Sequence, residues 1–328
     1  MKFLKFIILF FCTSLYSQDY FYPVAQLDSD RFICMDQKEG RNIQVVLWSK
    51  KTTKKEKLLS SSYVPFGVRL LPNKSGFSFI DNGRIRVKKF HKRCPQSLDL
   101  YYPLYNFTLL HWIDSVCFYA SAKYCDNYGL YQIGVDGNVS ILLEKEGIDY
   151  LYPQKIDDLL FYVERVDGLY SIKSAAYPLM KKDLFIDGSC SFEEKVALLL
   201  EQENKEKKIE IDELQSLTII SSQKDPILFL TMASNSMGFY LTHKAAIDKN
   251  DKAIKFFYHQ INLKSGIWSD EKLFSFSVPL EVLTSDSKKY LQESIFPLVP
   301  RYNYENNSIK YFIFNNRNYL ERVAYVLK

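Results

Sequence analysis

The residue types that could carry out catalysis are present in this sequence, but they do not form a catalytic motif. Ser-x-x-Lys, which can set a lysine beside a nucleophilic serine, occurs at Ser221, Ser269 and Ser285 without its accompanying motifs. The four histidines form neither His-Glu-x-x-His nor His-x-x-Glu-His, and Gly-x-Ser-x-Gly is absent. The sequence also lacks a phosphate loop and a dinucleotide fingerprint. It therefore predicts no catalytic residue and no cofactor.

Aspartates are the remaining candidates for chemistry, because glycoside hydrolysis needs a pair of carboxyl groups. Most of them stand among turn-forming residues, where a carboxylate accepts hydrogen bonds from nearby backbone amides. We therefore expect turn formation rather than catalysis at Asp114, Asp126, Asp157, Asp158 and Asp167.

The cysteines do not predict a metal site. His91 and Cys94 form His-x-x-Cys, but a second ligand pair at a zinc-like spacing is missing. Five cysteines follow the first twenty residues, an odd number, so at least one cannot form a disulfide within a monomer. These five are Cys34, Cys94, Cys117, Cys125 and Cys190, and most of them are expected to be small buried apolar residues.

A basic segment, "RIRVKKFHKR" at residues 84–93, is the binding candidate. Strand alternation predicts Arg84, Arg86 and Lys88 on one face and Ile85 and Val87 on the other. One interpretation is a charged strand that discourages edge pairing. The other is a surface for an anionic partner, such as a lipid headgroup or an acidic protein. Its residues would be Arg84, Arg86, Lys88, Lys89 and Arg93, reinforced by Lys50, Lys51, Lys54 and Lys55.

The first twenty residues, "MKFLKFIILFFCTSLYSQDY", have the layout of a secretory signal peptide: two lysines, a short apolar core and then small or polar residues. The apolar run is shorter than the roughly 20 residues that cross a bilayer. We expect a signal peptide over residues 1–17 and a periplasmic or secreted protein; a retained anchor and a lipoprotein site at Cys12 are the alternatives. The net charge of +5, which includes Lys2 and Lys5 of this segment, is too small to indicate a nucleic-acid partner. Export also argues against such a partner.

All of these residues lie on or between strand-like runs of sequence. The pattern of these runs repeats about every forty residues. A glycine precedes the third run of the first four units, at Gly40, Gly83, Gly129 and Gly168. Each unit predicts a four-stranded antiparallel sheet, and stacking such sheets around an axis gives a β-propeller. We expect an all-β propeller of six four-stranded blades, with five or seven as alternatives. The run at residues 181–187 should complete the fourth blade, and the sixth unit has only three runs, so we expect the ring to close near Asp19. The glycines should supply positive φ values in hairpin turns.

The period breaks after Gly188. Residues 191–216 mix acidic and basic residues, and Ser191 with Glu194 forms a plausible capping box. We expect a helical insertion between blades four and five, inside a propeller domain of residues 19–328. It is either an outer decoration or a docking helix or lid.

The repeat units resemble the WD40-like propeller repeats of the TolB type, which occur in exported bacterial proteins. The likeness is carried by two apolar strands, a turn with Gly, and then Leu-Tyr-x-Ile, as in "NYGLYQI" at 127–133 and "VDGLYSI" at 166–172. It covers the chain from about residue 20 outside the insertion, without the separate N-terminal domain of TolB. The resemblance implies a propeller fold and a habit of binding.

Two functions follow as hypotheses. The first is a non-enzymatic, monomeric propeller scaffold that binds a protein or peptide partner, with peripheral contact to an anionic surface. The alternative is a divergent propeller hydrolase acting on glycan or peptide. Convergence of carboxylates or a histidine at one mouth of the channel would favour the hydrolase.

Overall fold

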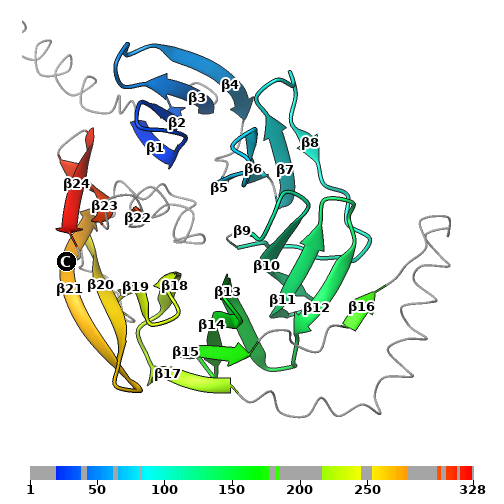
Figure 1. Cartoon of the computed structure of the whole chain (residues 1–328), viewed down its shortest axis with the longest axis vertical. Coiled ribbons are helices and arrows are strands. Elements are labelled where there is room, and N and C mark those ends of the chain that lie inside the picture. Colours follow the sequence, from blue (N-terminus) through cyan, green and yellow to red (C-terminus); the bar gives the residue numbers. More distant parts are fainter. Residues whose placement is uncertain are drawn as a thin grey trace, which may run out of the picture. The chain divides into compact units, whose positions relative to one another are not determined.

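The computed structural model describes residues 20–37, 43–61, 66–81, 83–108, 110–176, 182–184, 216–244, 253–279, 301–303, 308–315 and 318–326 of the 328-residue chain. All elements in these ranges are β-strands (Figure 1). The chain divides into two compact units, residues 1–97 with 249–255 and 276–328, and residues 98–248 with 256–275.

The first unit contains three antiparallel sheets. Blade one consists of β1 (Tyr20–Gln26), β2 (Arg31–Gln37), β3 (Ile43–Ser49) and β4 (Lys55–Ser61), in that order. Blade two consists of β5 (Phe66–Leu70), β6 (Gly76–Asp81), β7 (Arg84–Lys89) and β8 (Gln96–Ser97). The C-terminal sheet has three strands, β22 (Arg301–Asn303), β23 (Ser308–Asn315) and β24 (Asn318–Val326). β1 lies against both β5 and β24, so sequence-distant sheets meet in this unit.

The second unit contains most of blades three, four and five. Blade three consists of β9 (His111–Trp112), β10 (Cys117–Tyr124), β11 (Asn127–Gly134) and β12 (Val139–Leu143), with β16 (Lys182–Leu184) added outside β12. Blade four consists of β13 (Ile148–Ile156), β14 (Leu159–Val166), β15 (Leu169–Ala176) and β17 (Ser216–Gln223). Blade five consists of β18 (Ile227–Ser234), β19 (Met237–His243), β20 (Ala253–Lys264) and β21 (Ile267–Pro279).

These meandering four-stranded sheets define an all-β propeller, which confirms the predicted fold class. The predicted number of six four-stranded blades is wrong, because five sheets have four or more strands and the C-terminal sheet has three. Among the described strands, no N-terminal strand completes that sheet. Asp19, where we expected the ring to close, lies outside the described residues.

The outer strand of blade four was predicted incorrectly. The run at residues 181–187 was expected to complete blade four, but β16 pairs with β12 of blade three (Figure 1). β17 takes the outer place on β15 instead. The predicted insertion therefore falls within blade four, ahead of its last strand, and Ser216 at its end is part of β17. Residues 191–215 themselves lie outside the described residues. None of the described elements is a helix.

The hairpin turns confirm part of the glycine prediction. Gly83 and Gly168 have φ values of 71° and 76°, the left-handed conformation that a tight hairpin requires. Gly129 differs, because it lies inside β11 and the turn before it is made at Cys125, with φ of 53°. A Cβ on Gly129 would stand 2.5 Å from the Tyr131 hydroxyl oxygen, so this glycine makes room for a side chain. Gly40 lies outside the described residues.

The first strands share an irregularity that we did not predict. The pairing register shifts by one residue once in β1, β5 and β13 and twice in β18, each time against the second strand of the blade. In β13 the shift spans Tyr152 and Pro153, and Tyr152 has a φ of 54°. Beyond it, Gln154 binds the backbone of blade five, through Leu230 O at 2.9 Å and Met232 N at 2.7 Å. The bulge thus directs a side chain that joins two blades.

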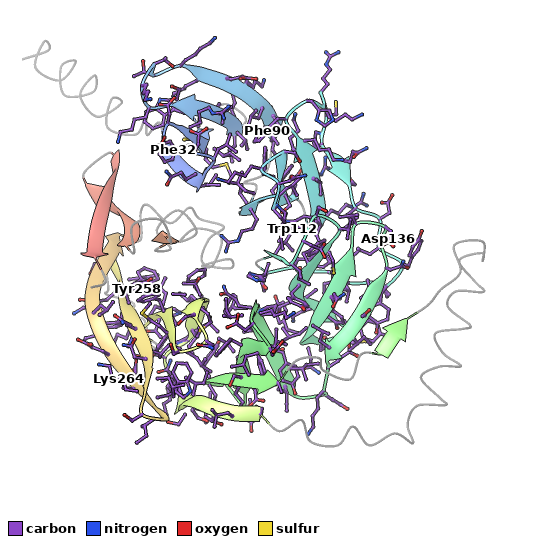
Figure 2. The ribbon with its side chains drawn as sticks, in the orientation of Figure 1. Phe32, Phe90, Trp112, Asp136, Tyr258 and Lys264 are labelled. Carbon is purple, nitrogen blue, oxygen red and sulfur yellow. The ribbon has the colours of Figure 1, made fainter. Side chains whose placement is uncertain are left out.

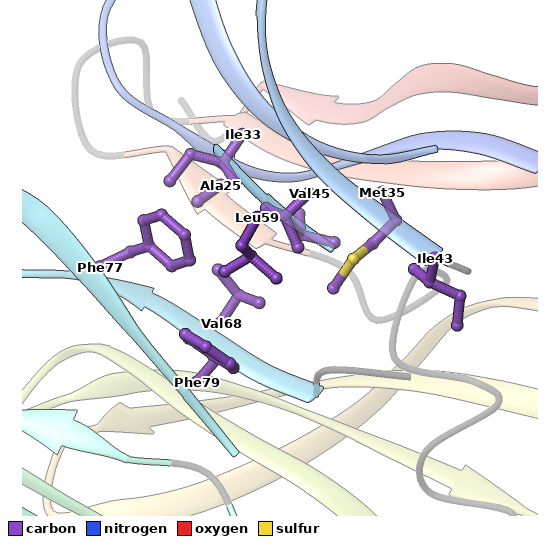
Figure 3. Packing of buried hydrophobic residues seen from close by; sticks show 10 residues of the cluster. Ala25, Ile33, Met35, Ile43, Val45, Leu59, Val68, Phe77 and Phe79 are labelled. Atoms are coloured by element: carbon purple, nitrogen blue, oxygen red, sulfur yellow. The ribbon is translucent and has the colours of Figure 1, made fainter. Parts of the chain in front are cut away.

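The cores lie between neighbouring sheets. In the first unit, buried residues of blades one and two face each other, among them Ile33, Val45, Val68, Phe77 and Phe79 (Figure 3). In the second unit, Tyr119 and Leu130 of blade three pack with Leu160 and Tyr162 of blade four. Burying the sheet faces in this way removes roughly 25 cal/mol of unfavourable hydration free energy per Å² of apolar surface.

The signal-peptide prediction concerns residues 1–17, which lie outside the described residues. Within the described ranges, no helix has the length and apolar character needed to cross a membrane.

Candidate functional site

The predicted basic segment is divided by the structure. Arg84, Lys89 and Arg93 are exposed, whereas Lys88 is only 3% exposed. The Lys88 ammonium donates hydrogen bonds to the carbonyl oxygens of Lys89, at 3.1 Å, and Lys92. Lys88 is therefore buried against backbone carbonyl groups at the end of its own strand, and its charge is not open to solvent as that of Arg84 is.

The other basic residues are also of two kinds. Arg86 Nε lies 3.2 Å from Asp81 Oδ2, and Lys55 Nζ lies 2.8 Å from Asp36 Oδ2. Lys50, Lys51 and Lys54 are exposed. Outside these two ion pairs, the exposed positive charge of the predicted basic residues is therefore carried by only some of them: Arg84, Lys89, Arg93, Lys50, Lys51 and Lys54.

The turn aspartates mostly form turns, as predicted. Asp114 accepts a hydrogen bond from Val116 N at 2.8 Å, and Asp157 and Asp167 adopt positive φ values of 50° and 49°. Asp136, labelled in Figure 2, accepts one from Asn138 N at 3.1 Å. In the described ranges, no group of three histidine, cysteine, aspartate or glutamate side chains could hold a metal ion.

The cysteines follow the prediction of burial in part. Cys34 is buried and Cys117 is half-buried, but Cys94 and Cys125 are exposed. Cys190 lies outside the described residues.

Blade five contains a line of polar groups that resembles a hydrolase relay. His259 Nε2 lies 3.2 Å from Thr242 Oγ1, whereas His259 Nδ1 lies 3.4 Å from Asp270 Oδ1 without forming a hydrogen bond among the described residues. The imidazole stacks on Tyr240, with ring centroids 4.4 Å apart. Thr242 is only 2% exposed, so its hydroxyl is closed to a substrate in this conformation. The order Thr, His, Asp matches that of a nucleophile, a base and an orienting carboxylate.

A different group of side chains gathers at one end of blades three and four. In blade three, Lys123 of β10 pairs with Tyr128 of β11, one step from the hairpin turn, and its ammonium lies 5.3 Å from the Tyr128 ring centroid. In blade four, Arg165 of β14 pairs with Tyr170 of β15 at the same step, and its guanidinium lies 5.9 Å from the Tyr170 ring centroid. We name these four residues, with Tyr105 and Asp149, the Tyr–cation cluster.

Asp149 joins the two halves of the Tyr–cation cluster. Its Oδ2 accepts hydrogen bonds from Arg165 Nε, at 2.7 Å, and from Arg165 Nη2. Its Oδ1 accepts one from Tyr128 N of blade three at 2.8 Å. A carboxylate of blade four thus fixes both the cation of its own blade and the backbone of the neighbouring blade, which holds the two hairpin ends in one arrangement.

The cluster leaves aromatic surface and hydrogen-bond donors open to solvent. Tyr105, bridged to Lys123 through the backbone, is 42% exposed, and the Arg165 side chain is 38% exposed. Gln223 of β17 pairs with Tyr170 and continues the row, but its Nε2 is buried and therefore not open to solvent.

Burial raises the pKa of the Tyr128 hydroxyl, and the Asp149 charge raises it further, against a smaller opposite effect of Arg165. Burial alone would lower the pKa of Arg165, but its hydrogen bonds to Tyr170 and Asp149 and the charge of Asp149 raise it overall. At neutral pH the tyrosine is therefore a neutral donor and the arginine a cation.

The sequence repeat did not predict the Tyr–cation cluster, because it aligns the wrong pair of tyrosines. The repeated Gly-Leu-Tyr aligns Tyr131 with Tyr170, whereas the hairpin register aligns Tyr128 with Tyr170. Leu130 is fully buried, while Leu169, its counterpart in the repeat, is 38% exposed. Counting from the turns, two residues into each strand, would have found the pairs.

No protein-family model and no curated protein sequence matches this chain. Among solved structures, a TolB candidate from Agrobacterium tumefaciens is similar at a TM-score of 0.50 and 14% identity, over 80% of this chain and 83% of that one. The tricorn protease is similar at a TM-score of 0.51 and 10% identity, over 94% of this chain and 34% of its own. An oligogalacturonate lyase from Vibrio parahaemolyticus has a TM-score of 0.49 and 12% identity, over 94% of this chain and 89% of that one.

The class that these observations define is the β-propeller, and the predicted likeness to TolB-type propellers is confirmed for the fold. At 10% to 14% identity the similarity concerns the fold alone.

Proposed function

We propose that this chain is an exported, non-enzymatic β-propeller that binds a protein or peptide partner through the Tyr–cation cluster. The observation that carries the proposal is the repetition of one arrangement, a cation over a tyrosine at the same hairpin step, in two neighbouring blades that Asp149 joins. Tyrosine and arginine are the residue types that dominate protein-binding hot spots.

The fold itself does not require these pairs. Blade two has the same hairpin, closed by Asp81 and Arg84, and the next pair is Ile80 and Ile85. Both isoleucines are buried, at 0% and 1% exposure. Since an apolar pair satisfies the same position, strand pairing alone does not explain the half-buried aromatic and cationic pairs of blades three and four.

The test is crosslinking capture with the chain from residue 19 to 328, applied to envelope and secreted fractions. Tyr105→Ala and Tyr170→Ala should each reduce recovery of the partner, because a truncated hot-spot residue costs about 2 kcal/mol or more of binding free energy. Tyr101→Ala is the matched control, since Tyr101 is 38% exposed but its backbone nitrogen binds Gly137 O on another hairpin. Equal recovery from all four proteins would reject the proposal.

The alternative, a divergent hydrolase, is supported by the line of Thr242, His259 and Asp270. The burial of Thr242 weighs against it, because a substrate could reach the hydroxyl only after blade five rearranges. Hydrolysis of glycan or peptide libraries that His259→Asn abolishes, with folding intact, would favour this function over the scaffold.

A further inference from the structure

The last strand of blade four has an edge unlike the last strands of the other four blades. β17 is eight residues long, ends its sheet and pairs with β15, and no other described strand pairs with it. Its sequence, SLTIISSQ, contains no charged residue and no proline. An uncharged edge strand with high β-propensity is a ready template for pairing with another chain.

The other four blades protect their last strands by known means. β4 carries Lys55, Glu56 and Lys57, and β21 carries Asp270, Glu271 and Lys272. β8 has two residues, and β12 is covered by β16. Charge, shortness, cover and β-bulges are among the devices by which natural sheets avoid edge pairing. Among the described residues, β17 has none of the first three, and it has two register shifts against β15.

The side chains of β17 leave room for an added strand. Leu217 is 59% exposed, and Thr218, Ser221 and Ser222 are also exposed, while Ile219 is buried. At the far end of the strand, Gln223 stands beside Tyr170 of the Tyr–cation cluster. The edge is therefore continuous with the proposed binding surface.

We propose that β17 receives an extended, uncharged peptide segment of the partner as an additional antiparallel or parallel strand. This inference rests on the proposed function and assigns the form in which the partner binds. Main-chain hydrogen bonds to the β17 edge would supply affinity. An apolar or β-branched residue of the peptide opposite Leu217 would supply a favourable cross-strand pair.

A second copy of this chain fits the edge less well. A standard protein interface uses about 20 to 30 residues on each side, whereas β17 offers eight. Edge-to-edge pairing of two copies would therefore bury too little surface for a stable dimer, but a single peptide strand needs no more than the edge.

The probe for the test is a blocked, uncharged decapeptide of alternating threonine and valine with serine ends. A second peptide carries proline at a central position, which removes one donor from the ladder. Binding is measured by calorimetry, and the site is located by hydrogen exchange of the backbone amides. We expect slower exchange in residues 216–223 with the first peptide, and about tenfold weaker binding of the second.

Leu217→Lys should abolish this binding, because it places a charge on the edge strand, and charged side chains prevent edge pairing in natural sheets. Ile267→Lys is the matched control, because Ile267 is a 73% exposed apolar residue at the start of β21. Unchanged exchange in residues 216–223, or equal binding by the Leu217→Lys variant, would overturn the proposal. Concentration-dependent dimers that Leu217→Lys dissociates would also overturn it, in favour of self-association.

The failures of the two proposals can be told apart. If the peptide does not protect β17 while partner capture still depends on Tyr170, the strand-addition inference alone is wrong. If the peptide protects β17 but capture is insensitive to Tyr105 and Tyr170, the proposed role of the Tyr–cation cluster is wrong.

Discussion

Blade two and blade four use the same hairpin and place different chemistry on it. One step from the turn, blade two pairs Ile80 with Ile85, both buried, and blade four pairs Arg165 with Tyr170, both half-buried. The backbone ladder accepts either pair, because strand pairing fixes the spacing of opposed side chains and not their type. The difference teaches that the same hairpin position is fully buried in one blade and partly open to solvent in the other.

The largest expected effect is on the stability of the protein, at the buried isoleucine pair of blade two. Ile85→Ala should lower the free energy of unfolding by about 3 kcal/mol, because it leaves a cavity in a site that is 1% exposed. Thermal or urea unfolding measures this loss. Tyr170→Ala at the equivalent position of blade four should cost much less stability. A similar loss in both variants would mean that blade four also uses the position for its core.

Asp149→Ala should lower the free energy of unfolding by about 2 kcal/mol, because Arg165 loses its carboxylate and Tyr128 N loses its acceptor. The partial exposure of Arg165 keeps the loss below that of a fully buried pair. Asp126→Ala, at an exposed turn position, serves as the control and should change stability by less than about 0.5 kcal/mol. An Asp149→Ala protein as stable as this control would show that Asp149 does not hold the two blades together.

The exposed charge of blade two provides a smaller effect. Replacing Arg84, Lys89 and Arg93 by serine should weaken binding to vesicles containing phosphatidylserine by roughly tenfold at low salt. The same replacement at Lys244, Lys255 and Lys264 is the control of equal charge. Co-sedimentation measures both, and equal weakening would assign the effect to net charge instead of this surface.

The smallest effect concerns pH. The pKa of Tyr128 is raised by burial and by Asp149, so the folded state favours the neutral hydroxyl. Its contribution to stability is complete below the ordinary tyrosine pKa of about 10 and declines as the pH rises above it. Between about pH 9 and 11, wild-type protein should therefore lose slightly more stability than Tyr128→Phe. Parallel pH profiles of the two proteins would contradict this.

The repeat pattern was enough to predict the strands but not how all of them pair. Local turn chemistry and apolar runs mark β10 through β15 directly. The exchange of β16 and β17 depends on long-range pairing across the segment between them, which no local pattern encodes. The same limit explains the C-terminal sheet, where the three predicted runs exist and a fourth strand from the N-terminal region does not join them.

The candidate site was harder to predict than the fold. The basic run drew attention to Lys88, whose ammonium satisfies backbone carbonyl groups. Tyr128 and Tyr170 are ordinary strand residues in the sequence, and the repeat that contains them is out of step with the hairpins by three residues. Pairing across strands brings Lys123 and Arg165 beside them, and that partnership is visible only in the folded chain.

The most direct test transfers the pair of blade two to blade three. The double variant Lys123→Ile with Tyr128→Ile should keep the free energy of unfolding within roughly 1 kcal/mol of wild type, because blade two shows that the hairpin accepts two isoleucines. Capture of the partner should fall about tenfold or more, since one half of the Tyr–cation cluster is gone. A folded double variant that captures the partner as well as wild type does would contradict the account.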